Sequence, residues 1–333
     1  ELKAVVWRLD IGRIPLYLLD TNIPDNPPEL RTVTSRLYPG PRKLRLRQEL
    51  LLGIGGFRAL LALGYEPGVC HMNEGHAAFV ALARVAHFVK DRGFDLETAM
   101  QIVPRTSVFT THTPVPAGNE TFALDVAMPD LKAVAEETGV AVEQVVAWGQ
   151  GGTANAHELS MTILGLRMAQ YCNGVSKLHG RVARRMWQHL WPHRPHDEIP
   201  VSSITNGIHV ASWLSPECAP LYERYLGPAW RTHPGQPQML GQVTHIPDEE
   251  LWRAHELARS RLIRTARELA EQQLQARNAS RAEIVRAKSV LDHDALTIGF
   301  ARRFAAYKRA TLLLRDPARF ETLLTSEDRP VQF

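Results

Sequence analysis

Ser107-Val108-Phe109-Thr110-Thr111 is the stretch that decides the fold, since β-branched and aromatic residues in a short run are typical of a strand. Helical patterns flank it at residues 96–103 and 131–136. Further strands are predicted at residues 69–72, 200–204 and 296–300, and further helices at residues 44–63, 74–90, 142–148, 157–172, 177–191, 248–287 and 305–314. This alternation predicts an α/β fold of the doubly wound type with a parallel sheet.

The ends of the sequence carry less regular patterns. Residues 5–19 are predicted to form one or two short buried strands, and residues 20–43 a loop rich in Asn, Asp, Pro and Gly. The long charged helix over 248–287 is predicted to break at Asn278. Residues 329–333 indicate a strand that is just beginning, and the first residue is not methionine. We therefore expect the sequence to be truncated at both ends.

Length and composition are typical of a soluble globular protein. The chain has 333 residues, of which 44% are hydrophobic and 22% charged. No apolar run approaches the roughly 18 residues that cross a bilayer, and no signal peptide is visible. Three cysteines are too few and too scattered for a disulfide framework or a zinc site. We expect a cytoplasmic protein without a metal, a membrane segment or a nucleic-acid partner.

A basic segment gives the sharpest chemical signal. Arg302, Arg303, Lys308 and Arg309 follow the strand predicted at 296–300 and stand at the start of a predicted helix. The helix dipole disfavours cations there, so their presence suggests a bound anion such as phosphate. A solvated basic face is the alternative.

Glycine and histidine segments mark other possible ligand contacts. Gly53-Ile54-Gly55-Gly56 precedes a helical stretch and could present backbone N–H groups to phosphate, or could serve close packing between a helix and a strand. The segment 71–76 carries two imidazoles and a carboxylate, Glu74, between a strand and a helix. Its spacing does not fit zinc, so hydrogen bonds to a polar ligand or capping by Asn73 are expected.

Two further polar residues follow predicted strands. His112 leaves the 107–111 strand into a proline-rich loop, where it can point toward a ligand or play a structural part. Asn206 follows the 200–204 strand and could bind sugar hydroxyls, although an Asn-Gly turn explains it equally well. No Ser/His/Asp or Cys/His nucleophile arrangement and no Walker or G-x-G-x-x-G motif is present. The residues alone indicate an α/β protein that binds an anion and a hydroxylated ligand.

Five motifs in order carry a family resemblance. They are HMNEGHAAF at 71–79, THTPVPAG at 111–118, NGVSKLHG at 173–180, TNGIH at 205–209 and RFAAYKR at 303–309. The chain resembles α-glucan (glycogen/maltodextrin) phosphorylases of the short bacterial and archaeal type over nearly its whole length. The resemblance implies a glycosyltransferase-B architecture of two Rossmann-like domains, both incomplete here: residues 1–206 would be the later part of the first and residues 207–333 the opening part of the second.

The resemblance also implies an activity and a set of roles. The reaction is the reversible phosphorolysis of an α-1,4-glucan end by inorganic phosphate, which gives α-glucose 1-phosphate with retention. By motif, the catalytic residues would be Arg303, Lys308 and His112; the substrate-binding residues Asn206, Tyr307, Gly55, Gly56, His76 and Glu74; and the residues near the cofactor Arg302 and Trp213.

The family's cofactor is pyridoxal 5'-phosphate, and its lysine is expected beyond Phe333. We therefore expect this chain alone not to form the Schiff base and not to turn over. The resemblance further suggests an allosteric enzyme and leaves a homo-oligomer open. Two alternatives stay open: a nucleotide-sugar enzyme of the same architecture, such as a glycogen synthase, and a non-catalytic glucan-binding protein.

Overall fold

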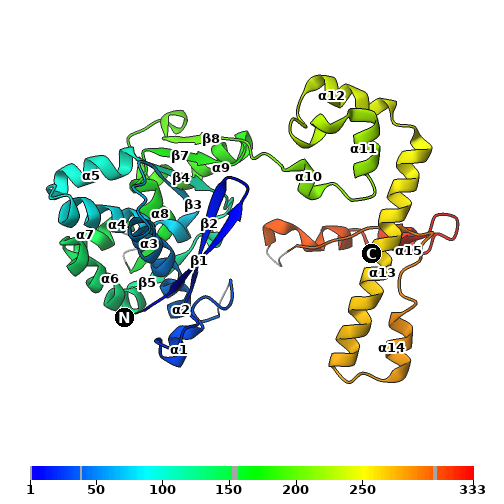
Figure 1. Ribbon diagram of the computed structural model, residues 1–333, viewed down its shortest axis with the longest axis horizontal. Helices are drawn as coiled ribbons and strands as arrows, with labels where there is room; N and C mark the ends of the chain where they lie inside the picture. The colour runs from blue at the N-terminus through cyan, green and yellow to red at the C-terminus, as the bar shows by residue number, and fades with distance from the viewer. Residues whose placement is uncertain (1, 38–39, 152–156, 303–305) are drawn as a thin grey trace. The chain divides into compact units, whose positions relative to one another are not determined.

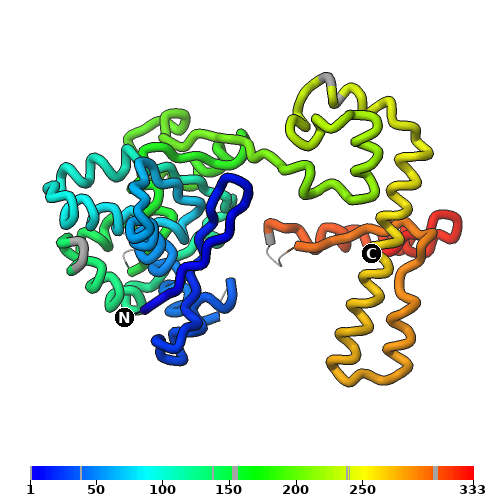
Figure 2. The backbone as a smooth tube through the Cα atoms, viewed as in Figure 1, coloured from blue at the N-terminus to red at the C-terminus, as the bar shows by residue number. Residues whose placement is uncertain are grey.

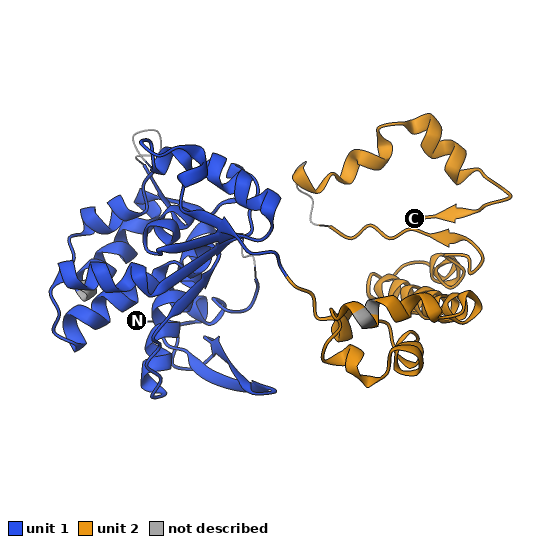
Figure 3. Cartoon of the chain, turned by 90° about the horizontal axis from the view of Figure 1, so that it is seen from above, with its two compact units in different colours: residues 1–206 blue, residues 207–333 orange. Residues whose placement is uncertain are grey.

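A computed structural model describes residues 2–37, 40–151, 157–302 and 306–333. The chain divides into two compact units, residues 1–206 and residues 207–333 (Figure 3). The first is built around a sheet, and the second is mostly helical. That the two units are parts of two Rossmann-like domains stays a prediction.

A parallel sheet forms the centre of the first unit. Its strands are β3 (Cys70–Asn73), β4 (Ser107–Thr111), β7 (Tyr171–Gly174) and β8 (Val201–Ser203), in the order β3-β4-β7-β8 (Figure 1). All neighbouring pairs are parallel, and Phe109 of β4 lies opposite Cys172 of β7. The mixed α/β architecture with a parallel sheet is therefore confirmed. All parallel strands end at one edge of the sheet, which is where ligands bind in α/β folds.

Helices surround this sheet and bury its apolar residues. They are α4 (Phe79–Ala86), α5 (Leu96–Arg105), α6 (Leu124–Thr138), α7 (Val142–Trp148), α8 (Met161–Arg167) and α9 (Lys177–Trp187). Helices α5 and α8 contact β4, while α9 contacts β7 and β8. Phe79, Phe109 and Leu164 are fully buried in the shared core. The predicted helix at 142–148 is confirmed.

The helix predicted over residues 157–172 is present only over Met161–Arg167. The predicted range contains the short strand β6 (Glu158–Ser160), which pairs with β5 (Thr121–Ala123), then α8, and then the first residues of β7. The Asn-Gly pair at 173–174, predicted to form a turn, instead forms the last two residues of β7. Residues 172–174 are buried because β4 and β8 flank them, and that pairing is a tertiary effect that overrides local propensity.

The N-terminal part forms a hairpin and a long helix. Strands β1 (Val5–Ile11) and β2 (Ile14–Asp20) pair in antiparallel register, but the expectation that they are buried is wrong, since Trp7 is 58% exposed. The predicted loop at 20–43 contains one short helix, α1 (Pro28–Arg31), and ends where α2 begins. Helix α2 (Arg42–Leu50) continues through a π-helical turn at Leu51–Gly55 into α3 (Gly56–Ala62).

The second unit contains a long helix and a small parallel pair of strands. Its elements are α10 (Val210–Trp213), α11 (Ala219–Leu226), α12 (Pro237–Gln242), α13 (Asp248–Ala276), α14 (Arg281–Ala287), β9 (Leu296–Thr297), α15 (Pro317–Leu324) and β10 (Val331–Gln332). Strands β9 and β10 pair in parallel, which confirms both predicted strands in shortened form. The predicted break at Asn278 is also confirmed: its φ is 53°, and the backbone turns there between α13 and α14 (Figure 2).

The α-helix predicted over residues 305–314 is wrong for the part that the structure describes. Residues 306–308 and 310–314 form two short 3₁₀ segments. Arg309 stands between them with a left-handed φ of 57°, which interrupts a continuous helix. No described helix is both long and apolar enough to cross a membrane.

Candidate functional site

The carboxyl ends of three parallel strands are linked by polar side chains. The Thr110 hydroxyl of β4 donates to Asn173 Oδ1 of β7 over 2.9 Å. Thr110 Oγ1 also lies 2.7 Å from His71 Nε2 of β3. Because the hydroxyl proton is already used, the His71 ring must be the donor, which places a proton on its Nε2. The predicted convergence of polar residues at this edge is therefore present.

Glu74 joins the turn after β3 to the loop after β4. Its Oε1 accepts the backbone N–H groups of His112 and Thr113, the latter over 2.9 Å. It also accepts the hydroxyls of Thr113, over 3.1 Å, and of Thr111, over 3.3 Å. Its Oε2 accepts the N–H of Gly75 over 3.2 Å. Glu74 thus lies among the structural groups of the site.

The ring of His112 is held by the residue before Glu74. Its Nε2 donates to Asn73 Oδ1 over 2.6 Å, and the residue is exposed. A sugar hydroxyl could exchange with this amide, since imidazole and amide groups both donate and accept. His112 therefore stands at the ligand edge, as its position after a strand predicts.

His179 is a buried part of the site to which the sequence assigned no role. Its Nδ1 accepts the N–H of Val175 over 3.1 Å, so the proton lies on Nε2, which faces the carbonyl oxygen of Thr113 at 3.2 Å. The sequence feature that could have identified His179 as part of the site is its position in the NGVSKLHG motif at 173–180.

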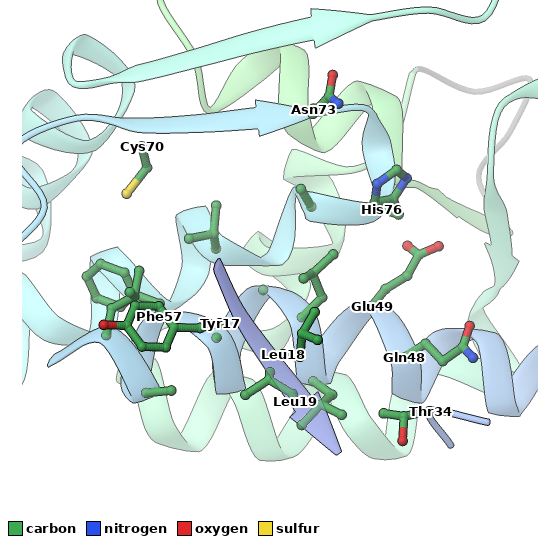
Figure 4. Close-up of a pocket in the computed structure, with 18 of the residues that line it drawn as sticks. Tyr17, Leu18, Leu19, Thr34, Gln48, Glu49, Phe57, Cys70, Asn73 and His76 are labelled. Carbon is green, nitrogen blue, oxygen red and sulfur yellow. The ribbon is translucent and has the colours of Figure 1, made fainter. Parts of the chain in front are cut away.

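A cavity of about 950 Å³ lies beside this edge, between β2, the helix α2–α3 and β3 (Figure 4). Most of its lining is apolar, including Leu19, Leu52 and Phe57. Glu49 and His76 project into its polar end from opposite walls. His76, predicted to bind substrate, therefore faces this cavity, and Asn73 also belongs to the lining.

Burial controls the protonation of both groups at the polar end. The Glu49 side chain is 1% exposed, and burial raises the pKa of its carboxyl to about 8 although Arg45 Nε, 2.9 Å away, acts in the opposite direction. Burial lowers the pKa of His76, and the charge of Arg45 contributes in the same direction. The polar end therefore favours neutral forms of both groups near neutral pH.

Glu49→Gln is expected to flatten the pH dependence of stability. The folded-state pKa of about 8 exceeds the ordinary value of 4.5, so the folded chain keeps a proton that the unfolded chain releases. The free energy of unfolding then falls as the pH rises from about 4.5 to about 8, in total by about 5 kcal/mol at about 1.36 kcal/mol per pKa unit. Thermal unfolding between pH 5 and pH 9 measures this. Glu136→Gln, at an exposed position on α6, is the control, and an unchanged slope in Glu49→Gln would contradict the assignment.

The glycine segment differs from the expected loop before a helix start. Gly55 and Gly56 have helical φ angles of −61° and −62°, and the N–H of Gly56 donates to Leu51 O inside the helix. Gly56 lines the cavity, together with Gly53. The expected geometry is therefore wrong, because residues 51–55 close a π-helical turn rather than opening a helix. The phosphate contact assigned to Gly55 and Gly56 stays a prediction.

The other predicted residues lie at the end of the first unit and in the second. Asn206 donates its backbone N–H to Val175 O over 3.2 Å, and its side chain is exposed. Trp213, at the end of α10, is 82% exposed. Lys308 Nζ lies 4.7 Å from the centre of the Tyr307 ring, and both residues are half-buried.

Arg302 is exposed, and Arg303 lies outside the described residues. Among the described residues, no group of three or more His, Cys, Asp or Glu side chains could hold a metal ion.

Comparisons with known proteins identify the family of the chain. Residues 29–315 match the model of a family described as carbohydrate phosphorylase. The chain is 42% identical to a maltodextrin phosphorylase of Thermococcus litoralis, over 98% of this chain and 38% of that protein. It is 41% identical to a glycogen phosphorylase of Mycobacterium tuberculosis (99% and 39%) and 35% identical to one of Aquifex aeolicus (98% and 47%). The chain thus spans less than half of the length of these relatives.

Proposed function

Because the chain belongs to the carbohydrate phosphorylase family, we propose that it is part of a retaining α-1,4-glucan phosphorylase. The complete protein would release α-glucose 1-phosphate from glycogen or maltodextrin with inorganic phosphate. The observation that carries this is the set of polar groups at the carboxyl edge of β3 and β4, namely His71, Asn73 and His112. Imidazole and amide groups at a sheet edge suit a ligand covered with hydroxyl groups.

The basic segment supplies the second part of the proposal. Lys308 and Arg303 would bind the substrate phosphate, and Tyr307 the sugar. Lys308 has its ammonium group on the face of the Tyr307 ring, where partial desolvation strengthens its attraction for a phosphate dianion. A cation held in place before the reaction stabilises negative charge that develops on the transferred group. Asn206 and His112 would orient the glucosyl unit.

The proposal includes pyridoxal 5'-phosphate, held by a lysine outside residues 1–333. When bound, this cofactor would supply a phosphate group that exchanges a proton with the substrate phosphate. The side chains of Arg302 and Trp213 are exposed and do not enclose such a group, and no lysine lines the described cavity. A cytoplasmic location, allosteric control, a homo-oligomer and the glycosyltransferase-B architecture stay predictions.

The test is the release of α-glucose 1-phosphate from maltodextrin by the product of the complete gene. We expect release that requires inorganic phosphate and yields the α-anomer, and no release by residues 1–333 alone. Transfer from a nucleotide sugar without phosphorolysis would contradict the proposal. Maltodextrin binding without any turnover would instead identify a glucan-binding protein.

A further inference from the structure

We propose that Glu74 is a positioning residue: its Oε1 fixes the loop 111–113, and with it the His112 imidazole, and this oxygen is not available to substrate. The proposal rests on the proposed function, because that function assigns His112 the role of orienting the glucosyl unit. Four donors converge on Oε1 of Glu74: two consecutive backbone N–H groups, of His112 and Thr113, and two hydroxyls. An oxygen that accepts this many hydrogen bonds has no lone pair left for a sugar hydroxyl.

The backbone of Glu74 supports the same conclusion. Its φ of 74° and ψ of 169° fall in a region that is essentially restricted to glycine. Such strain persists only where the surroundings hold the residue in place. They do so here, since Glu74 N donates to Thr110 O over 2.9 Å, and a Cβ at Gly75 would lie 2.9 Å from Thr162 N. A glycine would relieve the strain at position 74, so a side chain there indicates that its carboxylate is needed.

The carboxylate fixes one side of the loop and His179 fixes the other. Glu74 receives the N–H of Thr113, while the Nε2–H of His179 donates to the carbonyl oxygen of the same residue. The His112 ring then meets Asn73, the neighbour of Glu74, over 2.6 Å. The turn 73–74 therefore holds both the backbone and the ring of His112. Without the carboxylate, two adjacent N–H groups would lose their acceptor and the loop could reorient.

The decisive variant is Glu74→Gly, because it removes the carboxylate while easing the backbone. Hydrogen exchange of the His112 and Thr113 amides, followed by NMR in the 333-residue chain, should accelerate by about tenfold or more. The Phe109 amide in the core of β4 should stay protected, which shows that the chain remains folded. Glu74→Gln, which keeps an acceptor oxygen but loses the charge, should give a smaller acceleration. Unchanged exchange at His112 and Thr113 in Glu74→Gly would overturn the proposal.

Two further measurements distinguish the positioning role of Glu74 from a general effect of relieving backbone strain, and test it separately from the proposed function. Asn278→Gly changes another non-glycine residue of positive φ, 53°, in the second unit, and should leave both amides unchanged. In the complete gene product, Glu74→Gly should lower kcat by about tenfold or more with little change in KM for maltodextrin, and Glu74→Asp should restore part of the loss. A rise in KM alone would mark Glu74 as a substrate-binding residue. If the wild type releases no glucose 1-phosphate, the proposed function fails, while the exchange experiment still decides the role of Glu74.

Discussion

Gly53→Ala is expected to lower the free energy of unfolding by about 3 kcal/mol or more. A Cβ at this position would lie 2.6 Å from both Phe79 Cβ and Val80 N, and 2.7 Å from the carbonyl carbon of Phe79. Two of these three atoms belong to the backbone of α4, so no side-chain rotation relieves the clash. The continuous helix α2–α3, which contains Gly53, and helix α4 would have to move apart around the fully buried Phe79. Urea-induced unfolding of the 333-residue chain measures the loss.

Gly56→Ala is the matched control, three residues further along the same helix. Its Cβ would meet only Leu19 Cδ1, at 4.0 Å, and its φ of −62° is helical. Alanine favours a helix over glycine, so this variant should keep or raise stability, by up to about 1 kcal/mol. Equal losses in both variants would show that the glycines serve flexibility rather than contact with α4. Opposite signs would support the close-packing interpretation of Gly53 alone.

The glycine segment shows where sequence reasoning reaches its limit. Two interpretations were open from the residues, a phosphate-binding loop and close packing, and the second applies to Gly53. The partner in that packing is α4, a helix, whereas a strand was the expected partner. The contact joins residue 53 to residues 79 and 80, and no local pattern reports such a distant approach. Strand β4, by contrast, was predicted with its exact bounds, because its propensity and its burial agree.

The predictions for strand β7 and for the first hairpin were wrong for opposite physical reasons. Residues 171–174 have few β-branched side chains and an Asn-Gly pair, so only their place between β4 and β8 makes them a strand. The hairpin is rich in apolar residues, and buried strands were predicted from that richness. One of its faces nevertheless carries exposed apolar side chains, Trp7, Leu9 and Leu16 among them. Propensity indicates the local conformation there but not what covers it.

The sequence predicted where the candidate site lies but not the hydrogen bonds that join its residues. The sequence placed His71 in the last part of a predicted strand, and Glu74 and His112 after parallel strands, which brings them to one edge of the sheet. It gave no sign that Glu74 has a positive φ, or that two consecutive N–H groups turn toward its carboxylate. Both depend on the register of β3 against β4, which pairs Asn73 with Thr110. Register is a property of the folded sheet and is specified by many residues together.

Lys308→Ala in the complete gene product is expected to lower kcat/KM for inorganic phosphate by about 10²–10³-fold, the effect of removing one group that stabilises transition-state charge. The ammonium group lies over the Tyr307 ring, so a phosphate there would meet a cation that is already partly desolvated. Binding of maltodextrin should change little, since its hydroxyls are assigned to Asn206 and His112. Initial rates at varied phosphate and fixed maltodextrin, and then the reverse, separate the two effects.

Lys288→Ala is the control for this variant, because it removes a lysine of the same unit whose ammonium group pairs with Glu271 over 3.0 Å at the exposed surface. Exposed pairs of this kind contribute about 0–1 kcal/mol, so neither stability nor phosphate use should change much. If Lys308→Ala weakened phosphate use and maltodextrin binding equally, the lysine would be supporting the local fold. The assignment requires that the loss of kcat/KM be confined to phosphate, be absent in Lys288→Ala and be smaller in Lys308→Arg. Arginine keeps the charge but changes its geometry, so a smaller loss in Lys308→Arg shows that a cation at residue 308 contacts the anion directly.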